Sequence, residues 1–143
     1  HRDSSFLTSM NTLRIGLHEG HTKFSPGGKV GGAVLWELPE PPGSVELRLI
    51  WFTRGKGTEE VEVVATRHFE QPQAGDTRQF TFDLPEAPYS FSGKLISLIW
   101  ALELVMTPGK QFERLEIVVA PRGKEIILPS TRDTDWLRMQ NGN

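Results

Sequence analysis

The amino-acid sequence predicts an all-β domain in which two antiparallel sheets pack face to face. Apolar and polar residues alternate with a period of two along most of the chain, which is typical of strands that bury one face. Clusters rich in Pro and Gly, such as "SPGGK", "PEPPGS" and "TPGK", interrupt the alternation and end the strands. The 143 residues include no cysteine, so a single hydrophobic core must stabilise the fold without disulfides.

Seven strands and a short eighth are predicted, and this number of short strands favours a sandwich of two sheets. One domain is expected to cover residues 11–129. Residues 1–10 and 130–143 are expected to be terminal extensions, partly disordered or docked, the second through Trp136. The predicted strands are Thr12–Leu17, Lys29–Leu38, Val45–Thr53, Glu60–Phe69, Arg78–Leu84, Lys94–Thr107, Phe112–Ala120 and Glu125–Leu128.

Each long predicted strand carries apolar residues at alternate positions, and these sets are expected to meet between the two sheets. Truncating a buried Phe or Trp to Ala typically costs about 3–5 kcal/mol, so this core decides the stability of the domain. The predicted core consists of Leu13, Ile15, Leu17, Val30, Val34, Trp36, Val45, Leu47, Leu49, Trp51, Val61, Val63, Phe80, Phe82, Leu84, Ile96, Leu98, Trp100, Leu102, Leu104, Met106, Leu115, Ile117 and Val119.

Charge and hydropathy exclude two classes of partner. The net charge is −2, the isoelectric point is about 6.1, and Lys and Arg are scattered, so nucleic acid is not expected to bind. The most apolar run, Leu95–Met106, contains Ser97 and Glu103 and is shorter than the ~20 residues of a membrane-spanning helix. We expect a soluble domain, either cytoplasmic or the soluble part of an envelope protein. Because the chain begins with His1 rather than Met, a tag remnant, a processed terminus or a fragment of a longer protein is also allowed.

Two segments resemble those of the arrestin-like domain family. "KFSPGGKVGGAVLWEL" (Lys23–Leu38) resembles the family's aromatic-x-Pro-Gly-(Glu/Asp/Gly)-x-Val-x-Gly-x-Val segment. "FTFDLPEAPYSFSGKLISLIWALEL" (Phe80–Leu104) resembles its later Phe-x-Phe-x-Leu-Pro-x-x-x-Pro-x-Ser-x-x-Gly-x-x-Ile-x-(aromatic) segment. The order and separation of the two segments match the family, and the resemblance covers roughly Leu13 to Ala120.

The resemblance implies an immunoglobulin-like sandwich that serves as a binding scaffold. The expected function is therefore a non-catalytic protein-interaction or scaffold module that binds through an outer sheet face or a sheet edge. Better-known members join two lobes, and this chain has room for one, so it resembles a prokaryotic single-lobe member. It lacks a Pro-Pro-x-Tyr adaptor motif and a basic phosphate-sensing run. Receptor binding and adaptor recruitment are therefore not carried over.

No enzymatic activity, catalytic residue or cofactor is expected from the sequence. Ser90 and Ser92 lie in a connection between strands, without a Gly-x-Ser-x-Gly elbow or an obvious base. Their hydroxyls are expected to bond nearby backbone groups that the prolines leave unpaired. The expected partner is a protein or a second copy of the chain. Attachment to a membrane-anchored or larger protein is also allowed.

The alternative function is a metal-binding or hydrolytic domain centred on "HEGH", the His18-Glu19-Gly20-His21 segment. Metalloproteases place two histidines four residues apart on one face of a helix, with a Glu beside the first. Here the spacing is three, and Gly20 between predicted strands favours an exposed turn. His68 could complete a metal site only if the fold brought it near His18 and His21.

The residues that alternate with the core predict a possible binding face. Glu46, Arg48, Ile50 and Phe52 share one face of Val45–Thr53, and Leu95, Ser97, Ile99, Ala101 and Glu103 share one face of Lys94–Thr107. These two strands are expected to be neighbours, so their outward apolar residues would form a patch of the kind that often marks an interface. A docked tail, a bulge or a cupped sheet would instead bury it. The candidate protein-binding residues are Ile50, Phe52, Leu95, Ile99 and Val118.

Overall fold

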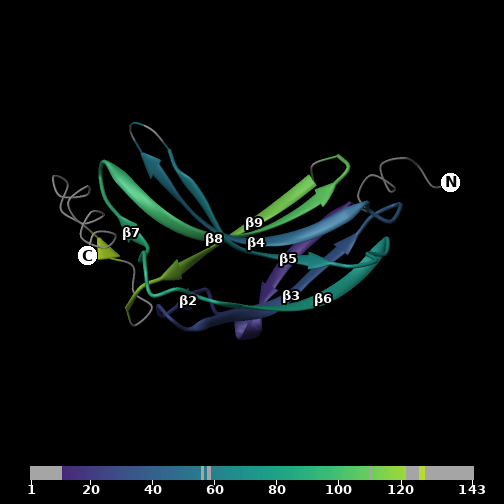
Figure 1. The fold of residues 1–143 in the computed structure, drawn as a ribbon, viewed down its shortest axis with the longest axis horizontal. Helices are drawn as coiled ribbons and strands as arrows, with labels where there is room; N and C mark the ends of the chain where they lie inside the picture. Colours follow the sequence, from purple (N-terminus) through teal and green to yellow (C-terminus); the bar gives the residue numbers. More distant parts are fainter. Residues whose placement is uncertain (1–10, 56, 58, 110, 122–125, 128–143) are drawn as a thin grey trace.

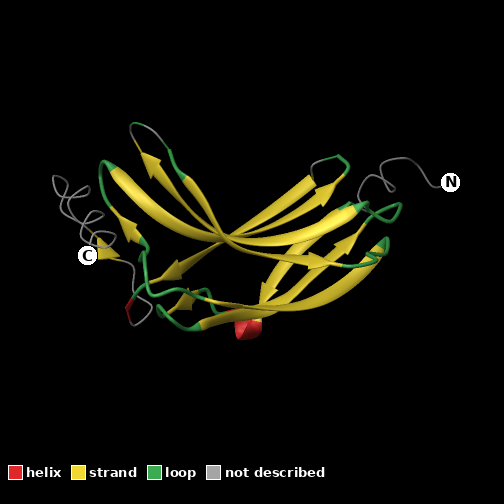
Figure 2. Cartoon of the chain, in the orientation of Figure 1, coloured by secondary structure: helices red, strands yellow, loops and turns green. Residues whose placement is uncertain are grey.

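The chain folds into a sandwich of two β-sheets in the computed structural model, which describes residues 11–55, 57, 59–109, 111–121 and 126–127. Figure 1 shows the sheets as two layers, with β3 and β6 below β4, β8 and β9. Figure 2 shows that strands and their connections make up nearly all of the coloured chain. The predicted fold class, an all-β sandwich, is confirmed. Within these residues, no helix has the length and apolar character needed to cross a membrane.

The small sheet is antiparallel and has the strand order β1-β3-β6. Its strands are β1 (Thr12–Leu17), β3 (Lys29–Glu37) and β6 (Gly75–Asp83). Val30 lies opposite Phe82, and both side chains are buried against the other sheet. A three-residue turn of 3-10 helix, η1 (His18–Gly20), follows β1.

The large sheet is built around β4 (Ser44–Gly55) and β8 (Ile96–Thr107), which pair antiparallel along their whole length. On the far side of β4 lies β5 (Val61–Phe69), and on the far side of β8 lies β9 (Gln111–Val119). Figure 1 shows β4 and β8 bowed, with the hollow side of the bow turned away from β3 and β6. The outer face of the large sheet is therefore concave.

Three two-residue strands extend the large sheet at its end near β9. Strand β2 (Lys23–Phe24) pairs parallel with β9, β7 (Phe91–Ser92) meets β8 at Leu98, and β10 (Ile126–Ile127) lies parallel to β7. The short parallel pairs depart from the prediction of purely antiparallel sheets. Strands of two residues are too short to produce an alternating pattern, so the sequence does not predict β2 and β7.

The long predicted strands all appear among the described residues, with bounds that differ by a few positions, and β10 falls inside the predicted short eighth strand. The C-terminal limit of the predicted domain, both terminal extensions and Trp136 lie outside the described residues. The predicted extent of the domain, residues 11–129, therefore stays a prediction.

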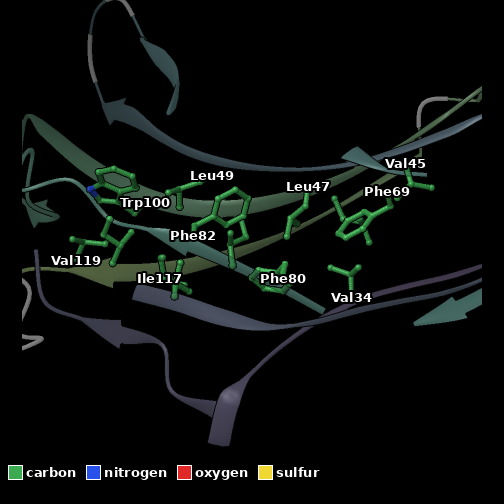
Figure 3. Close-up of a cluster of buried hydrophobic side chains, with 14 of the residues drawn as sticks. Val34, Val45, Leu47, Leu49, Phe69, Phe80, Phe82, Trp100, Ile117 and Val119 are labelled. Carbon is green, nitrogen blue, oxygen red and sulfur yellow. The ribbon is translucent and has the colours of Figure 1, made fainter. Parts of the chain in front are cut away.

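The core fills the space between the sheets, as Figure 3 shows for Leu47 and Leu49 of the large sheet and Val34 and Phe80 of the small one. Most predicted core residues are buried there, including Trp36 and Trp100, which are both 0% exposed. The apolar residues of β1, together with Trp51 and Ile96, are half-buried and pack against this cluster. Leu115 is also half-buried.

Two core predictions are wrong, because Val61 and Val63 are 63% and 48% exposed. Leu49 lies opposite Ala65, whereas its neighbour Ile50 lies opposite Val63, so β5 contains one extra residue at this point. Such a β-bulge shifts the alternation of a strand by one position. The two valines consequently share the outer face with Ile50 instead of the core.

Indole N–H groups donate hydrogen bonds to both of the connections that join β6 to the large sheet. Trp36 Nε1 donates to the carbonyl oxygen of Gln73, 2.6 Å away, between β5 and β6. Trp100 Nε1 donates to the carbonyl oxygen of Pro88, 2.9 Å away, between β6 and β7. These connections run from one layer to the other, so each bond ties a core tryptophan to a passage between the sheets.

Candidate interaction surface

The register of the large sheet brings apolar residues of three strands together on its concave outer face. Phe52 lies between Val61 of β5 and Ile99 of β8. In the neighbouring row, Ile50 lies between Val63 and Ala101. Directly opposed residues of an antiparallel pair point to the same side, so these side chains are all on the outer face.

The centre of this group is buried although no second sheet covers it in the described part of the chain. Ile50 is 1% exposed, Phe52 7% and Ala101 0%, and Ile99 packs against them partly buried. We call these four residues the outer cluster. It is separate from the core between the sheets. The bow of β4 and β8 and the long polar side chains around the cluster account for its burial.

Arginine side chains cover the outer cluster at Phe52. The guanidinium carbon of Arg114 lies 4.8 Å from the centre of the Phe52 ring, and that of Arg54 lies 5.4 Å from it. Cations attract the face of an aromatic ring, and each such contact contributes about 0.5–1 kcal/mol at an exposed site. The aliphatic part of each arginine also covers apolar surface while its head remains in water.

Glutamates hold these arginines in place. Arg114 Nη2 donates to Glu103 Oε2 at 2.8 Å, and Arg54 Nη2 donates to Glu116 Oε2 at 3.0 Å. Arg48 lies beside the first pair, with Nη1 3.8 Å from Glu103 Oε1. The outer face therefore has an apolar centre and a border in which arginines and glutamates alternate, so its charge is balanced.

The apolar surface is exposed along β5, next to the outer cluster. Val61, Val63 and Val64 are 63%, 48% and 37% exposed. Leu95, which precedes β8 and lies beside Gly55 at the end of β4, is 45% exposed. Sequence reasoning missed the valines of β5 as surface residues because no residue type in "VEVVATRHF" indicates the bulge.

The structure brings Ile50, Phe52 and Ile99, three of the candidate protein-binding residues, into one cluster. Ile50 and Phe52 are covered rather than open to solvent, so the sequence-based expectation of an open apolar patch at these two positions is not met. Val118 is half-buried and lines a cavity together with Ile99 at the end of β9. Of the five candidates, Leu95 has the most exposed side chain.

The histidine segment forms the predicted turn rather than a helical metal motif. Glu19 and Gly20 have φ angles of 56° and 70°, outside the range of a right-handed helix. His21 Nε2 lies 2.9 Å from Glu19 Oε1, and both side chains are well exposed. Across the described residues, no three potential metal-ligating side chains come together, and His68 lies on β5 in the large sheet.

Ser90 bonds the backbone, as the sequence predicts, although its partner is distant in sequence. The buried hydroxyl accepts a hydrogen bond from the backbone N–H of Val119 at 3.0 Å. The N–H of Ser90 donates to the carbonyl oxygen of Val119 at 2.7 Å. The pair closes the large sheet where β9 ends, so Ser90 has a structural role in the connection before β7.

Comparison with known proteins supports the fold. No protein-family model matches the chain, and no curated protein matches it. Among solved structures, the chain is similar to Spo0M, a sporulation control protein from Bacillus subtilis, with a TM-score of 0.57 and 18% sequence identity. The match covers 78% of this chain and 49% of the Spo0M chain, so the chain spans about half the length of that protein. This likeness supports an arrestin-like sandwich.

Proposed function

We propose that the chain is a non-catalytic protein-interaction module of the arrestin-like type, as a prokaryotic single-lobe member would be. It binds through the concave outer face of the large sheet, along β5. One observation carries this proposal. The exposed side chains of Val61 and Val63 continue directly into the outer cluster, so the sheet presents apolar surface beside a charged border.

An apolar centre with a polar border is the usual anatomy of a protein–protein interface, in which arginines are enriched. The arginines of this border are each paired with glutamate, which leaves no concentrated positive charge for a phosphate backbone. A protein surface therefore matches this face better than nucleic acid does. The buried Ile50 and Phe52 lie beside the exposed valines on the same face, and Leu95 is exposed near the end of β4.

The name of the similar structure, Spo0M, also supports the proposed interaction module. Spo0M is called a sporulation control protein, and control exerted through protein binding is compatible with the proposed interaction module. At 18% identity the similarity to Spo0M supports the fold alone, and photo-crosslinking tests the interaction.

Site-specific photo-crosslinking in the native cell tests the proposal. A photoreactive amino acid at Val63 should give covalent adducts with protein, since this exposed side chain would lie in the interface. The matched control is Gln79, which is exposed on the outer face of the small sheet. Absence of adducts from position 63, or equal adducts from both positions, would overturn the proposal.

A further inference from the structure

In the part of the chain that the structure describes, strand β5 is an edge of the large sheet with one unpaired side. It ends the strand order β10-β7-β8-β4-β5, and β4 is its only strand partner among the described residues. Most of its residues are exposed. A long, exposed edge strand offers a row of unpaired N–H and C=O groups to another strand. The edge therefore has the hydrogen-bonding capacity to extend the sheet.

Because of the bulge, inward and outward side chains follow the same order on the two sides of it, counted from either end of β5. Before the bulge, Val61 and Val63 share the outer face with β4 residues, and after it Thr66 and His68 do so, because they lie opposite Arg48 and Glu46. In a strand without a bulge, any two outward residues are an even number of positions apart, whereas Val63 and Thr66 are three positions apart. For the residues on either side of Val64 and Ala65, the extra residue instead makes the pattern symmetric about the junction of those two.

This symmetry allows β5 to pair with itself around a two-fold axis perpendicular to the sheet. Such an axis keeps outward residues opposite outward residues, as an antiparallel pair requires. When the axis passes through the Val64–Ala65 junction, Val61 faces His68 of the second copy and Val63 faces Thr66. An edge bulge commonly prevents pairing. Here identical bulges meet, and their shifts in alternation match.

The same register pairs opposite charges. Glu62 lies opposite Trp51 and Arg67 opposite Leu47, so both belong to the inner side of β5. Around the axis, Glu62 of each copy faces Arg67 of the other, which gives two symmetric ion pairs. Moving the register by two residues in either direction places Glu62 opposite Ala65 or Phe69. In the first case Arg67 faces Glu60 instead, which lies just before β5 and outside the strand. Charge complementarity within β5 therefore favours one register and a second copy as the occupant.

We propose that β5 pairs antiparallel with β5 of a second copy of this chain, centred on the Val64–Ala65 junction, and joins two large sheets into one. The inference rests on the proposed function and names the partner of the same surface. In the dimer the outer faces of the two copies are continuous, so the exposed valines of each lie beside the outward residues of the other.

Charge reversal with sedimentation velocity tests the dimer and its register. Glu62→Arg and Arg67→Glu should each weaken self-association at least roughly tenfold, because each homodimer would contain two pairs of like charges. An equimolar mixture of the two variants should dimerise again, since both contacts then pair Arg with Glu. Glu19→Arg, which reverses a charge in the exposed turn η1, is the matched control and should dimerise like the wild type. Circular dichroism verifies that every variant is folded.

Spin labels supply a readout that does not depend on Arg67, which also donates a hydrogen bond to the carbonyl oxygen of Thr81 in its own chain. The sequence contains no cysteine, so Val61→Cys can be labelled at a single site. In the proposed register the two labelled backbones are seven residues apart along the paired strands. Because of the bulge, this stretch spans the length of six residues of β4, about 20 Å. Double electron–electron resonance should show a distance near this value.

A wild-type protein that stays monomeric, a mixture that stays monomeric with both variants folded, or a clearly different label distance would overturn the dimer. The proposed function has a separate outcome. Adducts from Val63 to another protein, combined with a monomeric purified chain, would leave the interaction module standing and reject the second copy as its partner.

Discussion

At the scale of single residues, Asp76 shows how one carboxylate organises the passage from the large sheet to the small one. Its Oδ2 lies 3.0 Å from Arg78 Nη2 and also accepts the backbone N–H of Gln73. Arg78 in turn donates to the carbonyl oxygens of Glu70 and Gln71 in the connection before β6. The hydrogen bond from Arg78 is the largest influence that lowers the pKa of Asp76 below its ordinary value of 3.8.

This lowered pKa predicts an acid-sensitive contribution to stability. A carboxyl with a lower pKa in the folded state stabilises the fold above its unfolded pKa, and the contribution disappears as pH falls through the folded pKa. Asp76→Asn should therefore lower the free energy of unfolding at neutral pH, by up to about 3 kcal/mol. The difference from wild type should shrink below a pH of about 4. Urea denaturation at a series of pH values measures both effects.

The control for Asp76 is Asp83→Asn, because the Asp83 side chain is 79% exposed and its ion pair with Lys29 lies at the surface. An exposed ion pair contributes little, so this variant should remain close to wild type. A gap between Asp76→Asn and wild type that is the same at pH 3 and pH 7 would contradict the assigned role of the carboxylate.

Single residues also show what alternation can predict. Trp36, Leu47 and Trp100 were placed in the core from the period of two, and all are 0% exposed. Asp76 and Arg78 lie on the inward side of β6, opposite Trp36 and Val34, although both are charged. Their placement depends on backbone groups of a neighbouring connection, carbonyl oxygens for Arg78 and an N–H group for Asp76. A one-dimensional pattern carries no information about those partners.

At the scale of elements, the pairing of β1 with β3 depends on a close backbone approach at Gly32. A Cβ atom at this position would lie 2.0 Å from the carbonyl oxygen of Gly16 and 2.8 Å from the Cα of Leu17. Both contacts are with backbone, which cannot rotate away as a side chain can. The "GKVGGAV" segment therefore needs a glycine here for a steric reason.

Gly32→Ala is expected to force β1 away from β3 and to lower the free energy of unfolding by about 1–3 kcal/mol or more. Hydrogen exchange should show faster exchange of amides in β1, and urea denaturation should show the loss of stability. Gly75→Ala is the matched control in the same sheet, because its Cβ would lie 4.0 Å from the nearest atom, the carbonyl oxygen of Trp36. If both variants were equally stable, the close approach would not be limiting.

The elements also mark the limit of sequence reasoning for the candidate site. The prediction that Val45–Thr53 and Lys94–Thr107 are neighbours is confirmed by the pairing of β4 with β8, and Ile50, Phe52 and Ile99 meet as that pairing requires. The cover over Phe52 was not predicted, because Arg114 and Arg54 reach it from different strands. Nor was the exposure of Val61 and Val63, which follows from one extra residue in β5.

At the scale of the whole molecule, the two sheets are joined through the indoles of Trp36 and Trp100. Replacing either residue with Phe would leave a carbonyl oxygen, of Gln73 or Pro88, without its donor. An unsatisfied buried acceptor costs about 1–3 kcal/mol, which applies to the buried Pro88, and the loss should be smaller at Gln73, which is exposed. The two bonds belong to different connections, so the losses in the double variant should add to within about 0.5 kcal/mol.

Urea denaturation of Trp36→Phe, Trp100→Phe and the double variant measures this additivity. Trp51→Phe is the control, since that ring is half-buried and packs at the border of the core. If the double variant had the same free energy of unfolding as the less stable single variant, the two connections would unfold as one unit instead of acting separately.

The two indole hydrogen bonds, one at each end of β6, also bear on how the protein would associate with a partner. Sliding of one layer over the other would break the bond from Trp36 or the bond from Trp100, so these bonds oppose relative movement of the two sheets. A protein that binds as proposed would then meet a preformed surface, and the sandwich would lose little conformational entropy on docking. The rate of encounter should therefore depend on orientation and charge rather than on a slow rearrangement of the sandwich.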